Sequence, residues 1–145
     1  MKKLSCLLLA LLLLFSCALA ESSYRGSLFT LRWADGAYQM DTTTYRGQSR
    51  NGYEWLFMLY NDRAMVDVSL MASPDVLEAH VGEPLTANGT FTAAGLSFSL
   101  YSLRDGVCAA APLGQKLLCF ELYEVTPGGS AVSLLTSLLS GLSLP

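Results

Sequence analysis

The chain has 145 residues, of which 52% are hydrophobic and 14% are charged, and its formal net charge is −3. This length suits a single domain with its own hydrophobic core, and the apolar, weakly charged composition excludes an intrinsically disordered protein. Beyond the adjacent Lys2 and Lys3, the basic residues are scattered along the chain, so that no basic stripe is available for binding nucleic acid.

The N-terminal twenty residues have the three parts of a secretory signal peptide. Two lysines follow the initial methionine, an almost unbroken apolar run covers 4–15, and small residues stand at Ala18 and Ala20 just before Glu21. We therefore expect cleavage after Ala20 and export to an oxidising compartment. Cleavage removes the two lysines, and seven basic residues then face twelve acidic ones, a formal charge of −5.

The expected products are a signal peptide over 1–20 and one domain over 21–145, secreted or otherwise extracytoplasmic. Two alternatives to this processing remain open. An uncleaved anchor is one of them, although the apolar run is slightly short for a bilayer span. The other is suggested by 14–17 (Leu-Phe-Ser-Cys), which resembles a bacterial lipobox in which Cys17 is lipidated. A membrane partner is expected only if Cys17 carries a lipid.

The first part of the mature chain alternates apolar and polar residues as strands do. A strand is predicted over 27–33, and Asp35-Gly36 is a strong signal for the turn of a β-hairpin. The returning strand is predicted over 37–41. The polar, glycine-containing segment 42–52 reads as a loop.

The middle of the chain predicts two longer strands followed by a short helix. Residues 53–60 are apolar on both faces, which is typical of a strand covered on both sides, whereas 64–71 alternates like a half-buried antiparallel strand. Ser73-Pro74-Asp75 has the residues of a helix start. Gly82 and Pro84 then end the helix after about two turns.

The last part predicts further strands and a C-terminal helix. Strands are expected over 90–92, 96–103, 107–111 and 117–125. Ala131 and a series of leucines that ends at Leu142 then recur at helical spacing, which favours an amphipathic helix. The predicted fold class is α+β, an antiparallel sheet built from hairpins with a short middle helix and the C-terminal helix packed on it.

Cys108 and Cys119 are the only cysteines of the mature domain, since Cys6 and Cys17 lie in the signal peptide. A hairpin with a symmetric loop over 112–115 would place them directly opposite each other. Opposed Cα atoms in a non-hydrogen-bonded pair are about 4.5 Å apart, which is within disulfide range. In an exported protein this arrangement predicts a structural disulfide, with two unpaired thiols as the alternative.

Recognisable catalytic chemistry is sparse. His80 is the only histidine, and its place near Gly82 favours a solvated histidine at a helix end. No serine-hydrolase, zinc-protease or P-loop motif is present, and we expect no cofactor, no metal site and no catalytic residue. A group of aromatic residues either forms a binding face for carbohydrate or protein or covers the core: Tyr53, Trp55, Tyr60, Tyr101 and Tyr123.

The order of elements resembles the PsbP-like (DcrB-like) α/β sandwich of small secreted bacterial proteins and lipoproteins. The resemblance rests on the patterns at 28–31 with Asp35-Gly36, and at 134–139 with Leu142. It implies a largely non-enzymatic family that binds partners or assists complexes of the cell envelope, and it assigns no site residue.

These observations favour an exported, non-enzymatic domain that binds a protein or cell-envelope partner. One alternative is a small envelope hydrolase with carboxylate chemistry, which would need acids such as Asp35, Asp67 or Glu121 to converge in a pocket. The other alternative is a lipid-anchored structural lipoprotein.

Overall fold

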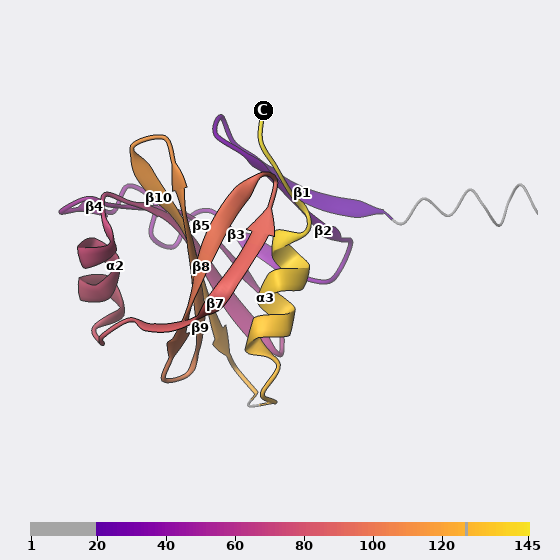
Figure 1. The fold of residues 1–145 in the computed structure, drawn as a ribbon. Coiled ribbons are helices and arrows are strands. Elements are labelled where there is room, and N and C mark those ends of the chain that lie inside the picture. The colour runs from indigo at the N-terminus through magenta and orange to yellow at the C-terminus, as the bar shows by residue number, and fades with distance from the viewer. Residues whose placement is uncertain (1–19, 127) are drawn as a thin grey trace, which may run out of the picture.

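A computed structural model describes residues 20–126 and 128–145. The expected signal sequence up to residue 19, with Ala18 and Cys17, lies outside the described residues. In the described part, two antiparallel sheets and two helices form the domain (Figure 1), which is an α+β architecture as expected.

The larger sheet has eight strands, and neighbouring strands run antiparallel in the order β3-β5-β6-β10-β9-β8-β7, with β4 paired to β5. Its strands are β3 (Gln39–Asp41), β4 (Ser49–Arg50), β5 (Tyr53–Tyr60), β6 (Ala64–Met71), β7 (Thr86–Ala93), β8 (Leu96–Leu103), β9 (Gly106–Leu113) and β10 (Lys116–Glu124). The pairing of β6 with β10 joins the two halves of this sheet.

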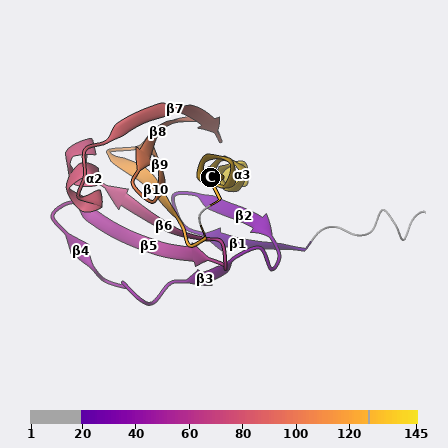
Figure 2. The ribbon, with the colours of Figure 1, turned by 90° about the horizontal axis from the view of Figure 1, so that it is seen from below.

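One face of the larger sheet packs against helix α3 (Ala131–Leu139) and a three-stranded sheet. The smaller sheet has the order β1 (Glu21–Arg25), β2 (Thr30–Ala34) and β11 (Leu142–Ser143). Figure 2 shows the larger sheet curving around this side of the molecule. The main core lies between these layers and contains the largest fully buried side chains, among them Phe29, Phe57, Phe98 and Phe120.

Helix α2 (Pro74–Val81) covers the other face of the larger sheet. It begins as predicted, because the Ser73 side chain accepts a hydrogen bond from the backbone N–H of Val76 at 3.4 Å. It ends at Gly82, whose φ of 73° is the left-handed conformation that glycine adopts most easily. Beneath it lies a second cluster of buried residues: Met71, Leu77, Cys108, Ala110 and Cys119.

The central strands were predicted most closely, and the two ends of the domain least closely. Strands over 53–60, 64–71 and 96–103 are confirmed with those bounds. The C-terminal helix ends at Leu139, because the chain turns sharply and Leu142 pairs with β2 as a strand instead. Strand β1 was not predicted.

The hairpin predicted at Asp35-Gly36 is wrong, because the strands on either side of this turn belong to different sheets. The strand expected over 27–33 runs from Thr30 to Ala34 and pairs with β1 and β11, whereas the strand expected over 37–41 starts at Gln39 and pairs with β5. The later strands are longer than expected. The short strand expected over 90–92 is the eight-residue β7. Segment 42–52 contains the short strand β4 as well as loop.

The predicted opposition of the two cysteines is wrong by two residues. The β9–β10 hairpin turns at Gly114, so that Cys119 lies opposite Ala110 and Cys108 lies opposite Glu121. Diagonal neighbours of this kind have Cα atoms about 7–8 Å apart, beyond the usual span of a disulfide. Both cysteines are buried and free in the structure.

Candidate functional site

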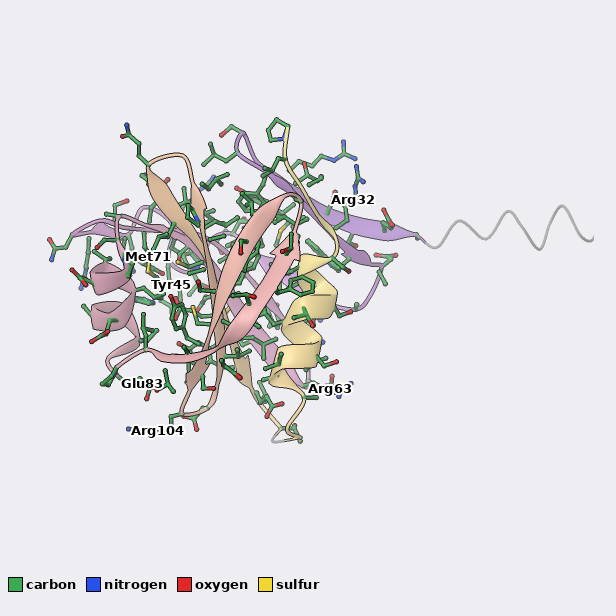
Figure 3. All side chains as sticks on the ribbon, in the orientation of Figure 1. Arg32, Tyr45, Arg63, Met71, Glu83 and Arg104 are labelled. Atoms are coloured by element: carbon green, nitrogen blue, oxygen red, sulfur yellow. The ribbon has the colours of Figure 1, made fainter. Side chains whose placement is uncertain are left out.

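A cavity of about 510 Å³ opens between helix α2, segment 45–51 and the face of the larger sheet that α2 covers. Segment 45–51 and α2 form its walls, and the sheet forms its floor. Figure 3 shows Tyr45 and Met71 beside α2. The cavity is lined by Tyr45, Gln48, Arg50, Asn51, Tyr53, Asp67, Val76, Ala79 and His80.

Strand register brings two acidic residues together beneath this cavity, of which Asp67 lines it and Glu121 is buried. Along β6 and β10 alternate side chains enter the main core, and the residues between them face α2. Asp67 and Glu121 are both on the α2 side, and their Cα atoms are direct partners across the two strands. Directly opposed residues have Cβ atoms about 4.5–5.5 Å apart, so these two carboxyl groups are neighbours.

Glu121 is almost completely buried, with 1% of its side chain exposed. Its Oε2 accepts a hydrogen bond from the Tyr123 hydroxyl at 2.8 Å. Its Oε1 lies 3.4 Å from Nε2 of His80, a contact without hydrogen-bond geometry that leaves Oε1 with no donor among the described residues. Burial raises the pKa of Glu121 to about 7, because the hydrogen bond from Tyr123 only partly opposes it and the Asp67 charge adds to it.

Asp67 is half-buried and is oriented by Trp55. The indole Nε1–H of Trp55 donates a hydrogen bond to Oδ1 of Asp67 at 3.2 Å, while Tyr45 packs edge-on against the indole with ring centroids 5.5 Å apart. Burial raises the pKa of Asp67, and the hydrogen bond from Trp55 and the nearby His80 oppose this rise. The second oxygen, Oδ2, accepts no hydrogen bond from the described residues.

His80 joins the cavity wall to the buried acid. Its ring stacks on Tyr53, with centroids 4.3 Å apart and an interplanar angle of 17°, and 34% of its side chain is exposed. Burial lowers the pKa of His80, an effect that the Asp67 charge partly offsets. The imidazole is therefore mainly neutral at neutral pH and is able to accept or relay a proton.

The cavity thus brings together one carboxyl group, that of Asp67, and the imidazole of His80, and the buried carboxyl group of Glu121 lies in contact with that imidazole. Each carboxyl is held by an aromatic donor, Trp55 for Asp67 and Tyr123 for Glu121. Such an arrangement either binds a group of complementary charge or moves protons. Within 20–126 and 128–145 no three His, Cys, Asp or Glu side chains are placed to hold a metal ion together.

The structure brings together only some of the residues singled out in the sequence. Of the three acids considered, Asp67 and Glu121 converge, whereas Asp35 lies at the turn after β2 and accepts a hydrogen bond from Ser22 at 2.7 Å. His80 is at a helix end as expected, but it is stacked and in contact with an acid rather than simply solvated. Tyr45 was missed, since nothing in its sequence surroundings indicates a pocket.

Among the aromatic residues singled out, Tyr53, Trp55 and Tyr123 surround the site. Tyr101 packs against the cluster beneath α2, and Tyr60 is exposed at the far end of β5.

Comparison with protein-family models, with curated proteins and with solved structures finds no match for this chain. In the part of the chain that the structure describes, no helix is long and apolar enough to cross a membrane.

Proposed function

We propose that the protein is an exported, non-enzymatic binding domain that takes a small group of a cell-envelope partner into the cavity beside α2. The observation that carries this proposal is the cavity itself, which has aromatic side chains on its walls and a half-buried carboxyl group at its base. Ligand sites are typically concave, with apolar or aromatic walls and a few oriented polar groups.

The details of the walls support binding. The rings of Tyr53 and His80 are fixed by stacking, and Asp67 is fixed by Trp55, so a ligand would meet groups that are already in place. Tyr45 lines the cavity while 43% of its surface remains exposed. An exposed aromatic residue next to a cavity supplies contact area at a small entropic cost.

The test is an NMR titration of the processed protein with defined envelope molecules, namely muropeptides, phospholipid headgroups and wall-polymer fragments. Ala79→Phe fills the cavity from the exposed side of α2, and Ala87→Phe adds the same bulk to an exposed position of β7. We expect shifts around the cavity that Ala79→Phe abolishes and Ala87→Phe retains. Binding that neither substitution changes, or no binding by any molecule of the panel, would contradict the proposal.

A second candidate, a small hydrolase with carboxylate chemistry, is favoured by one specific observation. Asp67 and His80 both line the cavity, and Glu121 lies behind His80 where a buried acid orients an imidazole in many hydrolases. This candidate predicts turnover of an ester, amide or glycoside that Asp67→Asn and His80→Gln each abolish. The exposed Glu78→Gln serves as the control, and absence of turnover across these classes counts against hydrolysis.

The PsbP-like resemblance and the extracytoplasmic location are further parts of the proposal. They are supported by the order of strands and helices and by the signal-like start of the sequence. The intact mass of the protein from the membrane and soluble fractions of its host tests the location. A soluble species that starts at Glu21 supports secretion, whereas a lipid-modified Cys17 supports a lipoprotein.

A further inference from the structure

The carboxyl group of Asp67 lines the cavity and that of Glu121 lies buried next to it, with no lysine or arginine among the described residues paired to either. Asp67 and Glu121 are direct cross-strand partners, and like charges in that position repel each other. The described residues form two salt-bridge contacts, and only that between His80 and Glu121 involves either acid. The imidazole is mainly neutral at neutral pH, so no lysine or arginine balances the pair.

Both acids also have acceptor oxygens that no described residue fills, but in different surroundings. Oε1 of Glu121 is buried without a donor and lies 3.4 Å from the histidine ring that forms the cavity wall. Buried polar atoms in folded proteins are nearly always hydrogen-bonded, so this atom marks a local need for positive charge or a donor. Oδ2 of Asp67, on a half-buried residue that lines the cavity, accepts no hydrogen bond from the described residues and is free to accept one from a ligand.

The walls suit a cation better than an anion. Tyr45 and Tyr53 line the cavity, and the faces of aromatic rings attract positive charge within about 6 Å. Arg50 is the one arginine or lysine among the described lining residues, and it is exposed on β4. Solvent and salt screen an exposed charge far more than one at the base of a cavity.

From this geometry we propose that the cavity binds an organic cation through a primary ammonium group, with Asp67 as the direct acceptor and the buried carboxyl group of Glu121 behind it. The inference rests on the proposed binding function and names the chemistry of the ligand. A primary ammonium is favoured over a quaternary one because it brings N–H donors for the unfilled carboxyl oxygens. Such a group is carried by free amines and by amine lipid headgroups.

The hydrogen bond between Trp55 and Asp67 provides a direct readout. In ¹H–¹⁵N NMR spectra the indole cross-peak of Trp55 reports on Asp67, and that of Trp33, on β2, serves as an internal control. The processed protein is titrated with ethanolamine and, separately, with ethylene glycol, which lacks the charge. We expect a saturable shift of the Trp55 peak with ethanolamine alone, at a Kd of about 1 mM or tighter.

The matched variants are Asp67→Asn and Asp75→Asn, the latter at an exposed position of α2. We expect Asp67→Asn to weaken ethanolamine binding about 10-fold or more, and Asp75→Asn to leave it unchanged. Equal shifts with ethylene glycol, or equal binding by Asp67→Asn, would overturn the cation proposal. Another outcome is that ethanolamine does not bind, whereas a different ligand binds and Ala79→Phe abolishes that binding. In that case the cation proposal fails and the proposed binding function stands. If nothing binds, both fail.

Vesicles separate the two sources of the ammonium group. Binding to phosphatidylethanolamine vesicles but not to phosphatidylcholine vesicles supports a lipid headgroup and the need for N–H donors. Binding of free ethanolamine without vesicle binding supports a soluble amine. Equal binding to both kinds of vesicle contradicts the requirement for a primary ammonium.

Discussion

Replacing Glu121 by Gln should remove a pH-dependent part of the protein's stability. Burial raises the pKa of Glu121 from 4.5 to about 7, so the folded protein keeps a proton that the unfolded chain releases. Between these two pH values the folded state binds more protons, and raising the pH therefore destabilises it. Each unit of pKa shift corresponds to about 1.4 kcal/mol, which gives a loss of about 3 kcal/mol from pH 4.5 to about 7.

The other groups of the site must be separated from this effect. Burial also raises the pKa of Asp67, which acts in the same direction as Glu121. Burial lowers the pKa of His80, so the unfolded chain takes up a proton more readily and stability falls as the pH drops through about 6.5. Asp67 and His80 are both still present in Glu121→Gln. The difference in the free energy of unfolding between wild type and variant therefore reports the contribution of Glu121 alone.

The assay is urea unfolding of both proteins at a series of pH values between about 4 and 8, where the linear extrapolation gives each free energy of unfolding. The glutamine side chain keeps an oxygen for the Tyr123 hydroxyl and adds no charge. The free energy of unfolding of the variant minus that of wild type should rise by about 3 kcal/mol between the acidic and the neutral end of the pH series. Glu78→Gln, at an exposed position of α2, is the control. Parallel curves for wild type and Glu121→Gln would refute the assignment of a buried, protonated acid.

Three further predictions concern the fold. Leu139→Ala, at a fully buried position of α3, should lower the free energy of unfolding by about 2–5 kcal/mol, whereas Val132→Ala, 39% exposed on the same helix, should change it by less than about 0.5 kcal/mol in denaturant titrations. Gly141→Ala should cost more than about 1 kcal/mol, since its Cβ would lie 2.0 Å from a backbone oxygen of β2, and an unchanged melting temperature would contradict this close approach. Denatured, unreduced protein should react with an alkylating reagent at both Cys108 and Cys119, and protection of the pair would mean that the hairpin register differs.

The sequence predicts best those elements whose signals are local. Strands 53–60 and 64–71 show their alternation directly, and the short helix has its cap at Ser73 and its stop at Gly82 within the segment itself. The end of the last helix depends instead on a distant contact. Leu142 continues the helical spacing of the leucines, but its pairing with Leu31 in β2 outweighs that local preference.

The predicted direct opposition of the two cysteines is wrong for a similar reason. A symmetric four-residue loop and a two-residue turn at Gly114 are both compatible with the sequence between the cysteines. The choice between them is made by the whole register of β10 against β6 and β9, which also sets Glu121 opposite Asp67. The β9–β10 register that takes the two cysteines out of opposition also places Glu121 opposite Cys108, while the β6–β10 register places Glu121 beside Asp67.

The burial of Glu121 depends on which face helix α2 covers. In the sequence, Cys119, Glu121 and Tyr123 share a strand face that looks half-exposed, because it alternates with a more apolar one. Helix α2 packs on that face and excludes water from it, and so turns an ordinary surface acid into a buried one with a raised pKa. The helix also provides His80 and Ala79 for the cavity wall. The packing of α2 on the sheet thus produces both the buried acid and the cavity in front of it. A ligand that supplies a positive charge would reduce the free-energy cost of burying Glu121.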